Sequence, residues 1–253
     1  MKKIMIVEDE AVIALRLEQR IAEMGYEVIG MSHTGEDCVK KARSLLPDLI
    51  LMDVMISGDL DGIDAAKIMK KELDIPVIFM TAYTEDQIIE RAKEVEPYGY
   101  IIKPIRDREL KATIEIALYK KKMEKRLQES EEKYRQLFET ISDAIIIFDG
   151  ETRKIIDIND SCLSMYGYSK DEFLKLRLND ITAEPEKSEN AIKQAILGEI
   201  QKIPLRYHKR NDGTVFPVEI YSGTFSLENR IVVCGVIRDI SQRNRHEEEL
   251  RGS

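Results

Sequence analysis

Five residues in the first half of the chain carry side chains that could do chemistry together. Each of them follows closely on a short apolar run that is typical of a strand buried on both faces of a parallel sheet. Because the carboxyl ends of parallel strands meet at one edge of a sheet, we expect three carboxylates, a hydroxyl and an ammonium group to converge there. The five are Glu8, Asp9, Asp53, Thr81 and Lys103.

This set of groups is suited to phosphorus chemistry. Clustered carboxylates repel one another unless a hard divalent cation joins them, and Mg²⁺ takes oxygen ligands while it leaves room for a phosphoryl oxygen. An in-line phosphoryl transfer leaves protein groups little covalent work, so catalysis comes from positioning and from cations near the transferred oxygens. In this pattern Asp53 is the candidate nucleophile, and Lys103 and Mg²⁺ are the cations.

Length and composition limit the class of protein. The chain has 253 residues, of which 43% are hydrophobic, and this is enough for two ordinary domains with separate cores. Its 39 Lys and Arg residues against 47 Asp and Glu residues give a net charge of −8. The sequence has no clustered basic stripe, so we expect no nucleic-acid partner.

Neither a membrane segment nor a disulfide framework is indicated. Unbroken apolar runs such as Ala144–Phe148 are strand-sized, against the roughly 20 residues that a bilayer needs, and the run near the N-terminus is too short for a signal peptide. Cys38, Cys162 and Cys234 are far apart and form no Cys-x-x-Cys pair. We expect core thiols in a reducing compartment, in a cytoplasmic protein without membrane contact.

Strands and helices alternate strictly through the first half of the chain. The predicted strands cover residues 4–7, 28–31, 49–52, 77–80 and 100–102. The predicted helices cover residues 10–24, 34–46, 61–73 and 84–95, and a fifth helix starts after Pro104. This alternation predicts an α/β doubly wound, five-stranded parallel sheet of the flavodoxin-like kind, in a domain over residues 1–120.

The first domain resembles the receiver domain of two-component response regulators. The resemblance covers roughly half of the chain and depends on polar residues that occur in order at predicted strand ends. By this resemblance, Asp53 accepts a phosphoryl group from the phosphohistidine of a histidine kinase. The residues that carry the resemblance are Glu8-Asp9, Asp53, Thr81, Tyr100 and Lys103-Pro104.

The resemblance also implies roles for the neighbouring residues. Thr81 and Lys103 would contact the phosphoryl oxygens, and Tyr100 would turn inward when Thr81 is drawn toward the phosphate. The implied Mg²⁺ ligands are Glu8, Asp9, Asp53 and the backbone carbonyl of Met55.

Two features depart from the usual receiver pattern. The first acidic residue is Glu8, where the family usually has Asp, and a longer carboxylate could bind the metal through water. The loop over residues 54–62 is one residue longer than usual and lacks its proline. An alternative is that the carboxylates are solvated strand ends of a flavodoxin-like fold, but Glu8-Asp9-Glu10 would repel a flavin phosphate. Whether Lys103–Pro104 is a cis peptide stays open at this point.

A long helix is predicted between the two domains, because no Gly or Pro occurs from Ile105 to Asp149. We expect residues 121–133 to act as a helical linker. Apolar residues recur there at alternating four- and three-residue steps, the spacing of a coiled-coil seam, although a solvated spacer is an alternative. The seam positions are Met123, Leu127, Ser130, Tyr134, Leu137 and Ile141.

Strands bunched toward the end predict an α+β domain with an antiparallel sheet over residues 134–245. A hairpin is expected at residues 144–148 and 154–158, short helices at 161–197, and three strands at 203–209, 215–224 and 231–240. Pro217 must face an unpaired edge or a bulge, because it has no N–H for a ladder.

This second domain resembles the PAS family. PAS domains sense small ligands or cofactors, or pair with one another, and the ligand here is left open, including the possibility of none. We expect an apolar pocket or one filled by side chains, with His208 in a structural role and Cys162 as a small core residue. The matching segments are Phe138–Asp149, Asp157-Ile158-Asn159, Tyr166–Ser169, Asp212–Glu219 and Arg238–Ser241.

Together these features predict a response regulator that passes its phosphorylation state through a helix to a PAS sensor or interaction domain. We expect a phosphoacceptor without kinase motifs, and homodimers formed through residues 84–95, 107–119 and the strand of Tyr100. One alternative is the regulatory front of a longer PAS-containing sensor histidine kinase, because the last helix looks cut off and Gly252-Ser253 resembles a cloning scar. Another is a PAS ligand sensor with a passive receiver scaffold.

Overall fold

The computed structural model describes residues 1–82 and 86–251, apart from the side chains of residues 86–89, 247–249 and 251. The chain divides into two compact units, Met1–Glu129 and Ser130–Ser253. Among the described residues, no helix is both long enough and apolar enough to cross a membrane.

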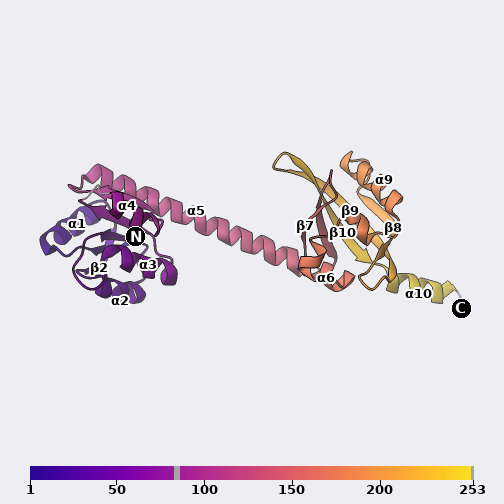
Figure 1. Cartoon of the computed structure of the whole chain (residues 1–253), viewed down its shortest axis with the longest axis horizontal. Helices are drawn as coiled ribbons and strands as arrows, with labels where there is room; N and C mark the ends of the chain where they lie inside the picture. Colours follow the sequence, from indigo (N-terminus) through magenta and orange to yellow (C-terminus); the bar gives the residue numbers. More distant parts are fainter. Residues whose placement is uncertain (83–85, 252–253) are drawn as a thin grey trace. The chain divides into compact units, whose positions relative to one another are not determined.

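The first unit is a parallel sheet with helices on both faces (Figure 1). Its strands are β1 (Lys3–Val7), β2 (Glu27–Ser32), β3 (Leu49–Asp53), β4 (Val77–Thr81) and β5 (Gly99–Ile102), in the order β2-β1-β3-β4-β5. Its helices are α1 (Ala11–Glu23), α2 (Gly35–Leu45), α3 (Gly62–Leu73), α4 (Asp86–Lys93) and the first part of α5 (Asp107–Thr140). The predicted doubly wound fold is confirmed, and residues 84 and 85 of the predicted helix 84–95 lie outside the described residues.

Two apolar cores explain why these strands are unbroken apolar runs. In β3, Ile50 and Met52 belong to the core under α2 and α3, while Leu49 and Leu51 belong to the core under α1 and α5. Successive side chains of a strand point to opposite faces, so a strand covered on both sides needs apolar residues throughout. The fully buried residues that α5 contributes are Leu110, Ile114 and Ala117.

The second unit is a five-stranded antiparallel sheet with short helices, as the sequence predicts. Its strands are β6 (Ala144–Asp149), β7 (Ile155–Ile158), β8 (Lys202–Lys209), β9 (Val215–Leu227) and β10 (Arg230–Asp239), in the order β7-β6-β10-β9-β8. Its helices are α6 (Asp160–Tyr166), α7 (Lys170–Phe173), α8 (Leu178–Ile181), α9 (Pro185–Ile196) and α10 (Ser241–Arg251).

Pro217 lies on β9, which is paired with β10 on one side and β8 on the other, so it is not on an edge strand. It lies opposite Tyr207 of β8, one residue beyond the last register pair of β9 with β10, Asp239–Val218. Its carbonyl accepts from the N–H of Ile240 at 3.1 Å, so its nitrogen faces the end of β10. The nitrogen of Pro217, which carries no hydrogen, therefore lies where the pairing of β9 with β10 ends, in agreement with the expected unpaired position.

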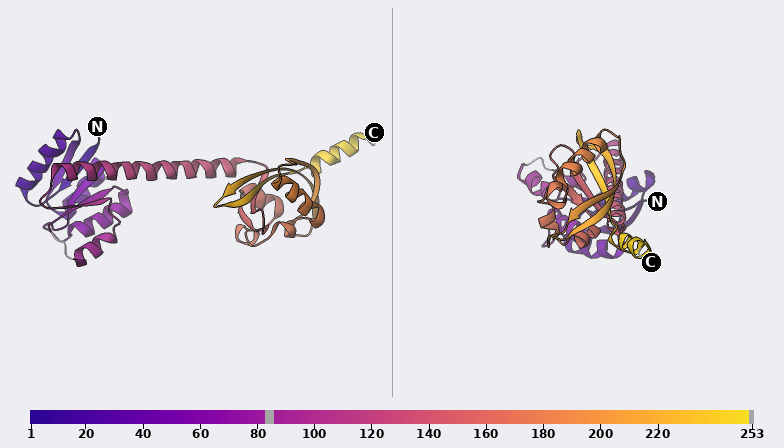
Figure 2. Two further views of the ribbon diagram at one scale, coloured as in Figure 1. Left: turned by 90° about the horizontal axis from the view of Figure 1, so that it is seen from above. Right: turned by 90° about the vertical axis from the view of Figure 1, so that its right-hand side faces the viewer.

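The long helix α5 is uninterrupted over 34 residues (Figures 1 and 2). It ends at Thr140, so the predicted seam residue Ile141 lies just beyond the helix. The carbonyl of Ile141 accepts hydrogen bonds from Asn159 and Ser161, which places this residue beside the start of α6.

Asn159 closes the end of α5 and is fully buried. Its Nδ2 donates to the carbonyl oxygens of Phe138, Ile141 and Asp143 at 3.2, 3.2 and 3.0 Å. Its Oδ1 accepts from the N–H of Ile145 at 2.8 Å and also caps α6. One amide therefore satisfies backbone groups from three elements that would otherwise be buried without partners.

A ring cluster forms the centre of the second core. Tyr166 and Phe173 pack edge to face with their ring centroids 5.4 Å apart, and Phe216 packs on Tyr166 at 5.6 Å. The hydroxyl of Tyr166 lies 2.5 Å from Nδ1 of His208, which is also buried. His208 thus has the structural surroundings that the sequence predicts, and Cys162 is confirmed as a core residue.

Replacing Asn159 with Ala removes the side-chain oxygen and nitrogen that bond to the backbone, and the backbone groups are then left buried without these partners. We expect Asn159→Ala to lower the free energy of unfolding of the second unit by about 2–4 kcal/mol, measured by urea denaturation. Asn211→Ala is the matched control, because the Nδ2 of Asn211 makes an exposed hydrogen bond to the carbonyl of Gly167. Equal losses in the two variants would contradict the proposed role.

His208 makes the second unit sensitive to acid. Burial lowers the pKa of His208 from 6.5 to about 4. Between these values the unfolded state binds more protons than the folded state, so the free energy of unfolding falls as the pH drops, by up to about 3 kcal/mol. In His208→Asn the loss between pH 7 and 4.5 should shrink, whereas His246→Asn, at an exposed histidine, should keep it. Parallel pH profiles for all three proteins would exclude His208 as the cause.

Candidate functional site

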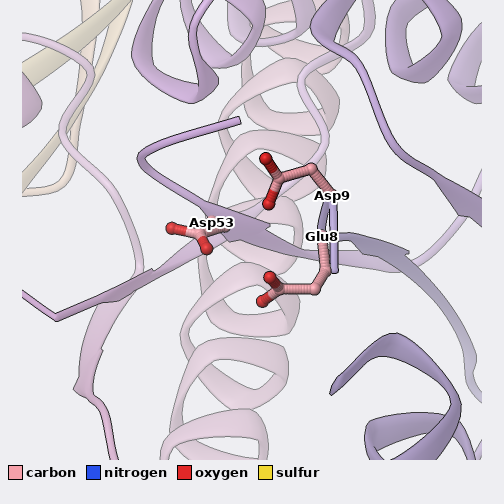
Figure 3. A group of neighbouring side chains, drawn as sticks. All are labelled: Glu8, Asp9 and Asp53. Atoms are coloured by element: carbon pink, nitrogen blue, oxygen red, sulfur yellow. The ribbon is translucent and has the colours of Figure 1, made fainter. Parts of the chain in front are cut away.

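Three carboxylates converge at the carboxyl edge of the first sheet. Glu8 and Asp9 follow β1, and Asp53 is the last residue of β3. One ligand oxygen from each lies within 4.8 Å of those of the other two, and Figure 3 shows the side chains of Glu8 and Asp9 extending toward Asp53. Glu8 and Asp53 are buried while Asp9 is exposed, so the group opens to solvent on one side.

Lys103 provides the positive charge in this group. Its Nζ donates to Oδ2 of Asp53 at 2.5 Å and to Oε2 of Glu8 at 2.7 Å. Burial alone would lower the pKa of Lys103, but the hydrogen bonds to the two carboxylates outweigh it, and the pKa is raised. The peptide bond between Lys103 and Pro104, which the sequence left open, is cis.

Glu8 has less hydrogen bonding than a buried carboxylate needs. Burial raises the pKa of Glu8, and the nearby Asp53 adds to the rise, while Lys103 opposes it. Its second oxygen, Oε1, is buried and has no hydrogen-bond partner among the described residues. An unsatisfied oxygen in a group of carboxylates fits a bound hard cation, because Mg²⁺ prefers oxygen ligands and would satisfy this atom. The side chain of Glu8 is longer than that of the Asp usual at this position, and its carboxylate still lies beside those of Asp9 and Asp53.

The carboxylate of Asp53 is oriented from both sides. Its Oδ1 accepts from the N–H of Met55 at 3.0 Å, and its Oδ2 accepts from Lys103. A Cβ on Gly62 would lie 2.0 Å from the carbonyl oxygen of Asp53, so glycine is required where α3 begins against the end of β3. The role of the Met55 carbonyl as a metal ligand stays a prediction.

The sequence missed the groups that hold the longer loop over residues 54–62. Oε1 of Glu36 accepts from the N–H groups of Asp59 and Leu60 at 2.9 and 2.8 Å, and such backbone hydrogen bonds lower the pKa of Glu36. Ser57 donates from Oγ to Oδ2 of Asp9 at 3.0 Å. The loop thus brings a hydroxyl to the carboxylate of Asp9. The position of Glu36 in the first turn of α2 was the available signal.

Thr81 and Tyr100 occupy the places that the motif predicts. Thr81 ends β4 and is buried, and its carbonyl accepts from the N–H of Lys103 at 2.8 Å. Tyr100 lies on β5 with 38% of its surface exposed, and its ring centroid is 6.1 Å from that of Phe79. Their roles as switch residues stay predictions.

The second unit contains a small cavity of about 50 Å³ between the sheet and α8–α9. Its lining is mostly apolar, with Ile146, Phe148 and Ile192 among the residues, as the sequence predicts. Two lining atoms, Nε of Arg206 and Oγ of Ser222, are buried and have no hydrogen-bond partner among the described residues. Unsatisfied polar atoms in an apolar cavity are the usual mark of a bound water or ligand group.

Comparisons with known proteins agree with this arrangement. Residues 4–115 match the response regulator receiver domain family, and residues 142–242 match a PAS domain family. The transcriptional regulatory protein PdtaR of Mycobacterium tuberculosis is 34% identical over 117 residues, which are 46% of this chain and 57% of that protein. The phyllosphere-induced regulator PhyR of Methylorubrum extorquens is 37% identical over 118 residues, which are 46% of this chain and 43% of that protein. The chain spans about half the length of these curated relatives.

Among solved structures, one similar protein is the signal receiver domain of a modulated diguanylate cyclase from Desulfovibrio desulfuricans. It is 37% identical, with a TM-score of 0.48, and the match covers 49% of this chain and 98% of that chain. The carboxylate group and Lys103 lie in the part of the chain that matches the first family, and the apolar cavity lies in the part that matches the second. By these matches, residues 4–115 are a response regulator receiver domain and residues 142–242 are a PAS domain.

Proposed function

We propose that the chain is a response regulator whose Asp53 accepts a phosphoryl group from the phosphohistidine of a histidine kinase. The observation that supports this most directly is the single ammonium group of Lys103 shared between Asp53 and the buried Glu8. Structural carboxylates at solvated strand ends would not need a cation held between them in this way. The histidine kinase is the partner that this chemistry requires.

In the proposed reaction an oxygen of Asp53 attacks phosphorus in line, a P–O bond forms, and the P–N bond to the donor imidazole breaks. The N–H of Met55 and the Nζ of Lys103 orient the attacking carboxylate. When bound by Glu8, Asp9, Asp53 and the Met55 carbonyl, Mg²⁺ neutralises charge on the phosphoryl oxygens. Lys103 remains beside the product and contacts a phosphoryl oxygen.

We further propose that Thr81 and Tyr100 report the reaction to the rest of the receiver. The hydroxyl of Thr81 would move to a phosphoryl oxygen, and the half-exposed ring of Tyr100 would turn inward to occupy the space that Thr81 leaves. Such a change biases the receiver between two states. Helix α4, strand β5 and the first part of α5 are the proposed homodimer face.

A second candidate function is a PAS ligand sensor for which the receiver is a passive scaffold. The two unsatisfied atoms in the apolar cavity, Nε of Arg206 and Oγ of Ser222, favour it. The two functions differ in whether Asp53 takes up a phosphoryl group at all.

Incubation with acetyl phosphate and Mg²⁺ separates these candidates. The native chain should gain the mass of one phosphoryl group in an intact-mass spectrum, and Asp53→Asn should gain none, because it lacks the nucleophile. Asp59→Asn is the matched control, since it removes an exposed carboxylate of the neighbouring loop and should be phosphorylated as the native chain is. No adduct on the native chain would support the passive scaffold, and an adduct on Asp53→Asn would assign another acceptor.

Mg²⁺ should stabilise the receiver, because the cation binds the folded carboxylate group and the unfolded chain lacks it. At a hundred-fold excess over its dissociation constant the gain is about 2.7 kcal/mol, seen as a higher midpoint of thermal unfolding in calorimetry. The gain should shrink severalfold in Glu8→Gln and persist in Glu10→Gln, at an exposed neighbouring residue. An equal effect of Mg²⁺ on both variants would remove Glu8 from the metal site.

A further inference from the structure

The middle of α5 has an uncovered apolar stripe. Every residue from 124 to 137 is exposed. Leu127 and Leu137 are 62% and 60% exposed, and Tyr134 is 54% exposed. A solvated helix is ordinarily polar on all sides, so three large exposed apolar side chains in eleven residues indicate a surface that something covers.

The stripe has the spacing of a coiled coil. With Leu127 and Tyr134 at positions a, the positions d are Met123, Ser130 and Leu137, all on one side of the helix. Leu127 lies about 140° around the helix from Ile114, which is buried in the receiver core.

The seam begins at Met123. The previous position a is Lys120, whose Nζ lies 5.1 Å from the ring centroid of Tyr98, and the following Glu124 accepts a hydrogen bond from the Tyr98 hydroxyl. The receiver therefore engages the helix as far as Glu124. Beyond Glu124 the side chains stay exposed as far as Leu137, and the ring of Tyr134 stacks on that of Phe138 in the same helix.

The charges beside the stripe identify the partner. Arg126 and Lys133 at positions g, and Glu131 at position e, make no ion pair within the part of the chain that the structure describes. On the outer side of the helix, by contrast, Lys125 and Glu129 are 3.9 Å apart within one chain. Charges of both signs without an ion pair therefore border the apolar stripe among the described residues.

In a parallel pair of identical helices, position g of one faces position e of the next heptad in the other. Arg126 then meets Glu131 of the second copy, and the contact occurs twice. In an antiparallel pair, g faces g and e faces e, so Arg126 would approach Lys133 and Glu124 would approach Glu131. The like charges oppose the antiparallel arrangement.

We propose that residues 123–137 of α5 form a parallel, in-register seam with a second copy of this chain. The proposal rests on the homodimer proposed above and adds its orientation, register and extent. Two heptads with Ser130 at a core position make a weak seam on their own. Pairing of the receivers raises the effective concentration of the second helix, so the seam closes when the receivers pair.

Disulfide formation at single positions tests the register. Leu127→Cys and Leu137→Cys, made separately in the full chain and oxidised with diamide, should both give linked dimers as two thiols become one disulfide. Only a parallel, in-register seam brings both positions against their own copies, because an antiparallel pair can do so for one at most. Lys125→Cys and Glu132→Cys, on the outer side, are the controls and should stay at the level of the native chain, whose own cysteines set the background.

Charge reversal tests the orientation. Arg126→Glu and Glu131→Arg should each weaken the dimer severalfold in sedimentation equilibrium, and the double variant should restore the native affinity. A stronger dimer in Arg126→Glu, or equal crosslinking on the seam and outer sides, would overturn the proposal.

The proposed seam and the proposed phosphorylation of Asp53 can be rejected independently of each other. Crosslinking is measured both with and without acetyl phosphate, at a protein concentration that favours dimers. Seam disulfides without any phosphoryl adduct would keep the seam and reject the switch, whereas an adduct without seam disulfides would do the reverse.

Discussion

The first unit depends on one electrostatic constraint, which is that carboxylates gathered at a buried edge need cations among them. Glu8 and Asp53 are taken out of water, where ionised groups are costly unless they are paired. Lys103 pairs with both, and it still leaves one oxygen of Glu8 without a partner. This unsatisfied oxygen, in a group of three carboxylates, fits a further cation.

The sheet order explains how distant segments meet. Strands β1, β3 and β4 are neighbours, and β5 follows β4, so Glu8, Asp53, Thr81 and Lys103 lie along one edge although the chain visits them far apart. The lysine reaches across β4 to both carboxylates of β1 and β3. Rigid strands buried on both faces hold these ends in place, which a set of loops would do less well.

Much of this could be predicted from the sequence, because apolar runs that stop at a polar residue locate strand ends, and strand ends locate the site. The apolar runs that precede Asp53 and Lys103 were enough to place both residues at strand ends. The hydrogen bonds of Glu36, Ser57 and Asn159 were not predictable, because the fold rather than the spacing brings their partners near. These partners are backbone groups for Glu36 and Asn159 and the Asp9 carboxylate for Ser57.

Helix α5 has to satisfy three demands along its length. Leu110, Ile114 and Ala117 belong to the receiver core, Phe138 belongs to a core cluster of the second unit, and residues 124–137 between them are exposed. A residue buried in either core cannot change its surroundings without disturbing that core, whereas an exposed stripe can gain a partner at little cost. The exposed middle is therefore the part of the helix where a change in the receiver can alter what the helix contacts.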